Sequence, residues 1–140
     1  MNWLLAWVGL GFVFNEIEKR QVEAKATELA QKSGKPIINI GARCNPFGDI
    51  RCDIAPRCKG VKYCDAENLT QYGDKEFSVA VLSHVLEHLD DPDQALTEAY
   101  RIADYVLVIT PSPIWPQTWL EPTHKWVFLS NRKIRIRTVE

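Results

Sequence analysis

The chain lacks an excess of charge of either sign. Among its 140 residues, 17 are Lys or Arg and 18 are Asp or Glu, which gives a formal net charge of −1. Proteins that bind nucleic acid usually present a basic face, so this balance argues against a nucleic-acid partner. One basic run, residues 131–137, is an exception, and its alternation of basic and apolar residues is typical of an edge strand with a charged outer face.

Closely spaced cysteines, internal repeats and low-complexity segments are also missing. The four cysteines, Cys44, Cys52, Cys58 and Cys64, form no C-x-x-C pair, so the close ligand spacing of a zinc ribbon is absent. Cys52 and Cys64 lie in short apolar runs, where free cysteine is often simply buried. We therefore expect reduced thiols, as in a cytosolic domain, in preference to disulfides or a metal site.

Residues 3–14, WLLAWVGLGFVF, carry no polar side chain. A membrane-spanning helix needs about 20 predominantly apolar residues, and the run reaches the lower limit of about 17 only when residues 1–17 are counted. No basic residue precedes it and no A-x-A site follows it, which argues against a cleaved signal peptide. Trp3 and Trp7 suit a membrane interface. We predict a short hydrophobic membrane anchor, with a buried core helix or an oligomer contact as the alternative.

A charged segment, residues 16–33, follows this run. It is rich in strong helix formers and pairs Glu with Lys three or four residues apart. Basic residues follow the apolar run and none precedes it, so the positive-inside rule predicts that the remainder of the chain faces the cytoplasm. Gly34 and Pro36 are expected to end the helix. We therefore predict an anchor and charged helix at 1–33 and a folded domain at 34–140.

Short apolar runs in the remainder predict strands separated by loops or a helix. The predicted strands are 36–41, 50–54, 61–64, 77–83, 105–110 and 134–139. Residues 92–103 have the apolar spacing of a helix, with Asp91 as its N-cap and Pro92 in its first turn. Alternation of strands with helices predicts an α/β fold with a parallel sheet.

In such sheets ligands bind beyond the carboxyl ends of the strands. Gly41 follows the first predicted strand, Asp53 lies in the second, Asp65 follows the third, and Ser83 and His84 end the fourth. Glycine lets a ligand approach the backbone closely. One carboxylate can accept two ribose hydroxyls, and a second can accept hydrogen bonds from an amino group. These positions predict a nucleoside-binding cleft.

Three stretches, INIGARCNPFGDIRCDI, VKYCDAENL and FSVAVLSHVLEHLDDPDQALTEAYRI, together resemble the class I S-adenosylmethionine-dependent methyltransferases, in particular the methyltransferase type 11 branch. The similarity covers about residues 36–130, and LEHLDDP with its following helix is its most specific part. The resemblance implies a reduced Rossmann-like parallel sheet, S-adenosylmethionine as cofactor, and methyl transfer as the reaction.

The resemblance also implies a set of cofactor-binding residues: Gly41, Ala42, Asp53, Ile54, Asp65, Ala66 and Ser83. In this assignment Asp53 would accept hydrogen bonds from the ribose hydroxyls, and Asp65 would lie near the adenine amino group. Ser83 and His84 would close the cleft beside the sulfonium. The chain departs from the family's G-x-G-x-G loop, because Arg43 stands where a second glycine is expected. A loop is expected between the first two strands, since Pro46 and Gly48 interrupt the short connection.

The sequence His84-x-x-Glu87-His88 also matches an inverted zinc-peptidase signature. Such a site needs a third ligand, for which His124, Glu121 or a cysteine is available. The acidic pair and proline that follow His88 end the turn early, whereas a metal-binding pair usually lies within a longer helix. We favour the methyltransferase cleft, expect no metal, and interpret His88 as a hydrogen-bonded residue behind the cleft.

Residues 111–128, PSPIWPQTWLEPTHKWVF, are predicted to form a stiff apolar lid over the cleft, or alternatively to pack against the anchor helix or the membrane. His84 and His124 are the candidate catalytic bases, needed if the acceptor must lose a proton. We expect a methyltransferase whose acceptor is a small molecule or a lipid, and the predicted anchor and apolar lid favour a lipid-like or membrane-delivered one. The alternative is a non-catalytic, membrane-associated scaffold of the same fold.

Overall fold

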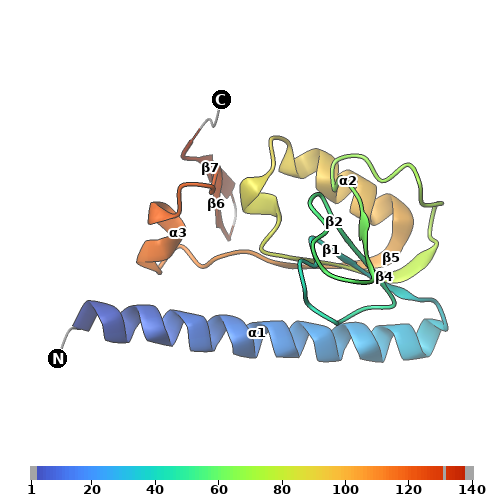
Figure 1. Cartoon of the computed structure of the whole chain (residues 1–140), viewed down its shortest axis with the longest axis horizontal. Coiled ribbons are helices and arrows are strands. Elements are labelled where there is room, and N and C mark those ends of the chain that lie inside the picture. The colour runs from blue at the N-terminus through green and yellow to red at the C-terminus, as the bar shows by residue number, and fades with distance from the viewer. Residues whose placement is uncertain (1–2, 131, 138–140) are drawn as a thin grey trace.

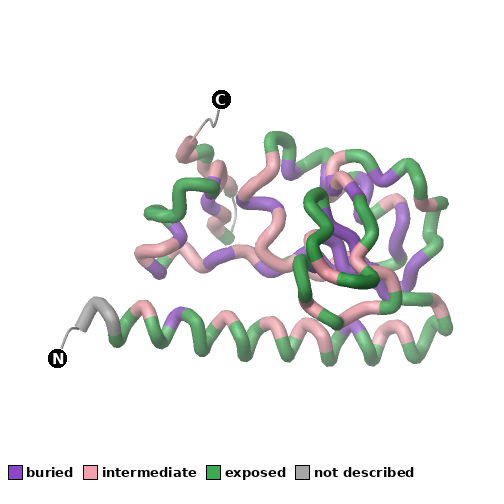
Figure 2. Tube along the Cα trace, viewed as in Figure 1, coloured by how far each residue is buried: buried purple, intermediate pink, exposed green. Residues whose placement is uncertain are grey.

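The fold is organised by two buried strands at the centre of its sheet. In the computed structural model, which describes residues 3–130 and 132–137, β1 (Ile37–Ile40) pairs in parallel with β4 (Phe77–Ser83). All of β1 and all of β4 except Ser83 are buried, because helices cover both faces of the sheet (Figure 2). The β4 strand has the bounds predicted from its continuous apolar run.

Three further parallel strands complete the sheet, in the order β3-β2-β1-β4-β5. They are β2 (Ile50–Asp53), β3 (Val61–Tyr63) and β5 (Ala103–Ile109). The predicted α/β fold with a parallel sheet is confirmed, and the ends of these five strands lie within two residues of the predicted ones. Residues 41–49 connect β1 to β2 through turns and bends, as the proline and glycine in this stretch predict.

Successive side chains of the central strands point to opposite faces, which gives two cores. Ile38 and Leu82 lie in the larger core, toward α2 (Pro92–Ile102), together with Ala95 and Ala99 of that helix. Asp91 caps α2 by accepting a hydrogen bond from the Gln94 amide at 3.1 Å, and Pro92 occupies the first turn, as predicted.

The opposite face of the sheet packs against α1 (Trp3–Ser33), a single helix of 31 residues (Figure 1). Its second half supplies Val22, Ala26 and Leu29, which pack with Ile37 and Val79 in the smaller core. The division of the chain at residue 33 stays a prediction, but the second half of α1 forms one layer of the α/β unit.

The helix α1 ends where the sequence predicts. Gly34 adopts a left-handed backbone with a φ of 71°, and its amide donates a hydrogen bond to the Ala30 carbonyl oxygen at 2.9 Å. This geometry is the usual glycine stop of a helix. A residue with a Cβ would be strained there, so Gly34 turns the chain from α1 into β1.

The first half of α1 extends beyond the sheet (Figure 1). Its ring contacts are with Trp115, which lies 6.2 Å from Trp7 and 6.0 Å from Phe14 between ring centroids. Within the described part of the chain, no helix combines the length and the apolar character that crossing a membrane requires. This finding goes against the spanning anchor predicted from residues 3–14.

The C-terminal segment forms a small separate unit above the first half of α1 (Figure 1). It contains α3 (Pro116–Leu120) and an antiparallel pair, β6 (Trp126–Leu129) with β7 (Arg132–Arg135). The strand predicted at 134–139 begins earlier than expected, and residues 138 and 139 lie outside the described residues.

All four cysteines are joined in two disulfides. Cys44 pairs with Cys58 and Cys52 pairs with Cys64, with Cα atoms 5.5 Å apart in each pair. The prediction of reduced thiols is therefore wrong. The parallel pairing of β2 with β3 sets Cys52 opposite Lys62 and brings β2 close to Cys64, which follows β3. The spacing of cysteines in the sequence does not reveal that pairing.

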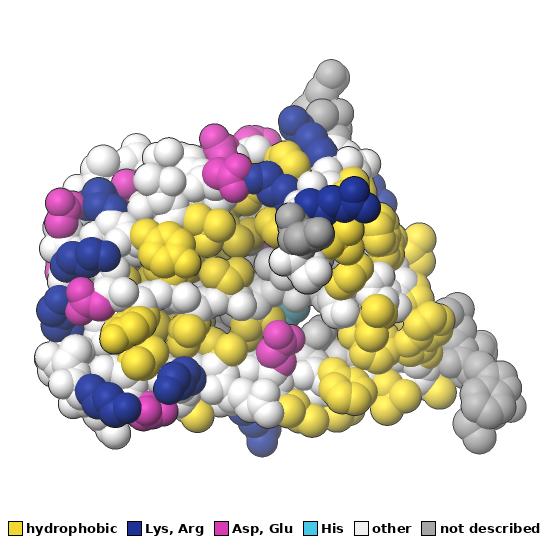
Figure 3. Space-filling view, turned by 180° about the vertical axis from the view of Figure 1, so that it is seen from behind, with side chains coloured by type: hydrophobic (Ala, Val, Ile, Leu, Met, Phe, Trp, Pro, Cys, Tyr) yellow, Lys and Arg dark blue, Asp and Glu magenta, His cyan; other side chains and the backbone are white. Residues whose placement is uncertain are grey.

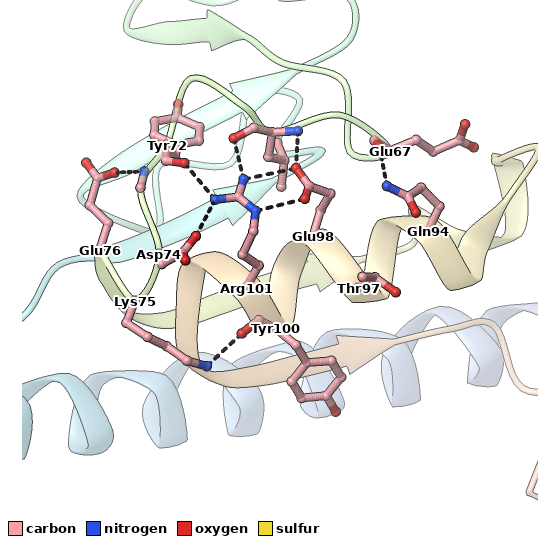
Figure 4. A network of polar contacts seen from close by, with 12 residues as sticks. Glu67, Tyr72, Asp74, Lys75, Glu76, Gln94, Thr97, Glu98, Tyr100 and Arg101 are labelled. Atoms are coloured by element: carbon pink, nitrogen blue, oxygen red, sulfur yellow. Dashed lines mark hydrogen bonds and ion pairs between the residues drawn. The ribbon is translucent and has the colours of Figure 1, made fainter.

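A polar network anchors α2 to the loop that precedes β4 (Figure 4). Arg101 binds Glu98 at 2.8 Å and Asp74 at 3.0 Å, and it donates further hydrogen bonds to the carbonyl oxygens of Tyr72 and Leu69. Glu98 is buried and also accepts a hydrogen bond from the Leu69 amide at 2.7 Å. The hydrogen bond from Arg101 is the main cause that lowers the pKa of Glu98.

We predict that Arg101→Ala lowers the free energy of unfolding by about 2 kcal/mol at neutral pH, because it leaves the buried Glu98 carboxylate without its main partner. The lowered pKa of Glu98 makes this contribution present above its ordinary pKa and lost as the pH falls through the lowered value. The difference between wild type and variant, measured by urea unfolding, should therefore shrink in acid.

The matched control is Arg20→Ala, since Arg20 forms an exposed ion pair with Glu16 within α1. It should cost less than about 1 kcal/mol. Equal losses for the two variants, or a difference that does not depend on pH, would contradict the role given to Arg101.

Candidate functional site

A cavity of about 500 Å³ lies at the carboxyl ends of the parallel strands. Its walls come from the ends of β1 and β2, the turn after β3, the segment after β4, and the chain just before β6. Six of the nine predicted site residues line it: Gly41, Asp53, Ile54, Asp65, Ala66 and His84. These six come from four connections far apart in the chain, and the strand order brings them together.

Asp53 ends β2 with its carboxylate held by the backbone. One oxygen accepts a hydrogen bond from the Arg43 amide and the other from the Ala55 amide, each at 2.9 Å. The residue is 9% exposed and reaches the cavity. Each carboxylate oxygen can accept more than one hydrogen bond, so Asp53 is both fixed in position and able to bind hydroxyl groups.

Asp65 lies on the neighbouring wall, after β3. Its Oδ1 accepts a hydrogen bond from the Glu67 amide at 2.9 Å, and its backbone bridges to Asn68 in a tight turn. Ala66, which is buried, and Ile54, which is exposed, add apolar surface beside the two carboxylates. The wall formed by β2 and β3 therefore combines two carboxyl side chains with apolar surface.

Gly41 has a φ of 71°, and its missing side chain makes room for Val85. A Cβ at Gly41 would lie 2.3 Å from Cγ2 of Val85. Glycine is thus required by the packing of the segment after β4, as well as by its left-handed backbone. That segment begins with His84, which has a φ of 54° and directs the chain away from the sheet.

Three imidazoles surround the carboxylate of Glu87 beside this wall. Nδ1 of His84 lies 3.4 Å and Nε2 of His88 lies 3.8 Å from Oε1 of Glu87. The rings of His88 and His124 are 4.9 Å apart. Burial is the main cause that lowers the pKa of His88, despite the opposing effect of Glu87, so the neutral imidazole is favoured there.

Three predicted site residues lie outside the cavity wall. Ala42 is buried and does not line the cavity, and Ser83 ends β4 without lining it. His124 is buried, and its Nδ1 lies 2.9 Å from the Thr118 carbonyl oxygen. Their cofactor and base roles stay predictions, but His84 is the candidate base that reaches the cavity.

The predicted lid contributes two cavity residues, Thr123 and Lys125. Its tryptophans lie elsewhere: Trp115 packs on α1, and the indole N–H of Trp126 donates to the Leu89 carbonyl oxygen at 2.9 Å. Lys125 forms an ion pair with Asp90 at 2.6 Å, and this contact lowers the pKa of Asp90. Trp115 therefore agrees with the alternative interpretation, in which the segment packs against α1.

Three charged residues of the wall were not among the predicted site residues. Arg43, Glu67 and Lys125 line the cavity with charged side chains. Glu67 also accepts a hydrogen bond from the Asp91 amide at 2.8 Å, which joins the turn after β3 to the start of α2. The contact of Glu67 with the LEHLDDP segment depends on the strand order, so the sequence alone does not reveal it.

A parallel sheet in the order β3-β2-β1-β4-β5, with acidic residues beyond two neighbouring strands around one cavity, has the strand-end geometry at which α/β domains bind ligands. A family model described as a methyltransferase domain matches residues 16–104, more than half of the chain. The chain therefore belongs to the class I S-adenosylmethionine-dependent methyltransferases, as its motifs predict. No curated protein and no solved structure matched it.

We predict that Gly41→Ala lowers the free energy of unfolding by about 3 kcal/mol, because the added Cβ collides with Val85 and strains the left-handed backbone. In a Val85→Ala background the same change should cost only about 1 kcal/mol, since the backbone strain then remains alone. Chemical denaturation of the four proteins of this cycle measures both values.

Gly9→Ala provides the control, because no atom lies within 4 Å of a Cβ built at that helical position. It should leave stability unchanged or raise it by about 0.5–1 kcal/mol. Additive costs for Gly41→Ala and Val85→Ala would show that the two residues do not pack as described.

Proposed function

We propose that this methyltransferase domain binds S-adenosylmethionine in the strand-end cavity and transfers its methyl group to a small-molecule or lipid-like acceptor. One observation carries the proposal: Asp53 and Asp65, from neighbouring parallel strands, line one cavity with Gly41 and Ala66. The cavity's volume of about 500 Å³ lies within the range of about 300–1,000 Å³ typical of small-molecule sites.

The residues of the wall fit the cofactor. Asp53, fixed by two backbone amides, would accept hydrogen bonds from the ribose hydroxyls. Asp65 would accept a hydrogen bond from the adenine amino group, beside the apolar surface of Ile54 and Ala66. When bound, S-adenosylmethionine supplies an electrophilic methyl group for direct displacement. The chain's main task is then to align the acceptor and to exclude water.

His84 is the residue that we propose as the base. It lines the cavity, and its Nδ1 lies 3.4 Å from the buried carboxylate of Glu87. An acceptor hydroxyl in the cavity could give its proton to the imidazole, and the Glu87 charge would stabilise the resulting cation. His124, the other predicted base, does not line the cavity and is the weaker candidate.

An exposed apolar surface supports an acceptor that is delivered by a lipid surface. Figure 3 shows hydrophobic side chains gathered toward the right-hand end of the molecule in that view. The members of this surface are exposed residues of α1 and of the segment at 114–120: Trp7, Leu10, Phe12, Val13, Phe14, Ile17, Ile114, Trp119 and Leu120. A patch of this kind marks a membrane or protein contact, and tryptophan favours the membrane interface.

The orientation of the domain toward the cytoplasm stays a prediction. The basic residues that follow the apolar run support it. The two disulfides weigh against it, because such bonds are rare in the cytosol. Membrane association through the apolar surface does not depend on which of these indications holds.

The second candidate function is a non-catalytic scaffold. It is favoured by residues 41–49, where turns and bends replace the helix whose N-terminus would face the cofactor phosphate or carboxylate in a Rossmann-like domain. Binding of S-adenosylmethionine separates the two candidates, because a scaffold has no use for the cofactor.

We predict that the purified chain binds S-adenosylmethionine with saturable heat in calorimetry and that Asp53→Ala weakens binding at least about tenfold. The variant loses charge-assisted hydrogen bonds to the ribose, each worth roughly 1.5–3 kcal/mol. Asp65→Ala should weaken binding in the same way, through the adenine.

Asp49→Ala is the matched control. Its carboxylate also accepts a backbone hydrogen bond, from the Ile37 amide at 2.8 Å, but at the amino-terminal end of β1, away from the cavity. It should bind the cofactor as the wild type does. A stable wild-type protein that ignores the cofactor would favour the scaffold.

We also predict that the protein sediments with phosphatidylcholine vesicles and that the double variant Leu10→Ser/Phe12→Ser reduces the bound fraction. The partition coefficient should fall about tenfold or more, because two exposed apolar side chains no longer enter the lipid. Tyr100→Ser/Tyr105→Ser removes two exposed aromatic residues from elsewhere on the molecule and should not change the partition. Equal effects of both double variants would refute docking through α1.

A further inference from the structure

Glu87 is a buried carboxylate without a hydrogen-bond partner. Its side chain is 0% exposed, and both of its oxygens lack a hydrogen bond within the described part of the chain. Its backbone is fixed, because the Glu87 carbonyl oxygen accepts a hydrogen bond from the Lys125 amide at 2.6 Å. Burial of an ionised group is costly unless the charge is paired or binds a cation. The carboxylate therefore points to a positive charge at this place.

Two histidines beside Glu87 are oriented by backbone carbonyl groups. Nδ1 of His88 lies 3.1 Å from the Thr123 carbonyl oxygen, and Nδ1 of His124 lies 2.9 Å from the Thr118 carbonyl oxygen. A carbonyl oxygen can only accept, so each ring must carry its proton on Nδ1. In the neutral ring, Nε2 then has a free lone pair. Histidines that bind metals usually donate their other ring N–H in this way.

The ligand atoms of these three residues converge. One atom each from Glu87, His88 and His124 lies within 4.8 Å of the other two. Two residues come from the turn after β4 and the third from the segment before β6, so the group joins parts of the chain that the sheet does not connect. A cation bound by all three would also fix the C-terminal unit to the α/β unit.

We propose that Glu87, His88 and His124 form a binding site for a divalent transition metal, with Zn²⁺ as the best-fitting ion. Two imidazoles and one carboxylate are the protein ligands of many zinc sites that keep a fourth position open. His88 lines the strand-end cavity, so the fourth position would face it. An oxygen of a bound molecule could occupy that position, where the metal would act as a Lewis acid.

This ligand set differs from the zinc-peptidase signature. In that motif both histidines are ligands and the glutamate is a base, whereas here His84 is outside the group and Glu87 is a ligand. His124 was already a possible third ligand in the sequence, and the fold brings it to Glu87. The inference replaces the expectation that the chain holds no metal, and it does not depend on cofactor binding.

Zinc binding is tested on the full chain, stripped with a chelator and treated with iodoacetamide so that no free thiol competes. Competition with a chromophoric chelator should give one Zn²⁺ per chain, and Co²⁺ should produce the strong visible absorption of a tetrahedral site. Glu87→Gln, His88→Gln and His124→Gln should each weaken Zn²⁺ binding at least roughly 100-fold, beyond the loss caused by removing an outer hydrogen-bond partner.

His84→Gln is the matched control, because it removes an imidazole 3.4 Å from Glu87 but none of the three ligands. It should weaken Zn²⁺ binding less than any ligand variant does, by at most the roughly 10–100-fold expected for an outer partner of a ligand. Circular dichroism verifies the fold of each variant, and the wild-type stoichiometry and Co²⁺ spectrum decide the matter if a variant does not fold. Lack of stoichiometric binding, a weak octahedral Co²⁺ spectrum, or binding that survives loss of Glu87 and His124 would overturn the site. The zinc titrations contain no S-adenosylmethionine, so their results are independent of the proposed function.

Discussion

The pairing of β1 with β4 is the constraint on which the rest of the structure depends. It sets Ile37 opposite Val79 and Ile40 opposite Leu82, so both strands end at the same edge of the sheet. Gly41 and the segment after β4 then meet, and Val85 occupies the space that a side chain at position 41 would need. The cavity exists because this contact makes both chains turn outward at the same level, with the acidic wall of β2 and β3 beside them.

Features that depend on neighbouring residues could be predicted from the sequence. The apolar run of β4, the Asp91 cap of α2 and the Gly34 stop of α1 each follow from a few adjacent side chains, and the structure contains all three. The two acidic residues of the wall were also predictable, because ligands bind at strand ends in any parallel α/β sheet. The resemblance to class I methyltransferases rests on these same local motifs and agrees with the family match over residues 16–104.

Features that depend on strand register or on distant segments could not be predicted. The cysteines pair because β2 and β3 are neighbours, and nothing in the spacing of Cys52 and Cys64 fixes that arrangement. His124 reaches Glu87 only through the path of the C-terminal segment, which the motif around Glu87 does not contain. The apolar start of the chain was misleading for a different reason: residues 3–14 continue into the same helix whose second half packs on the sheet.

The unbroken course of α1 has a mechanical consequence. Its 31 residues make a rod about 45 Å long at about 1.5 Å per residue. One end of the rod is embedded in the smaller core, and no joint separates that end from the protruding tip. A partner or surface that binds the first half of α1 therefore fixes the distance and the orientation of the cavity relative to itself.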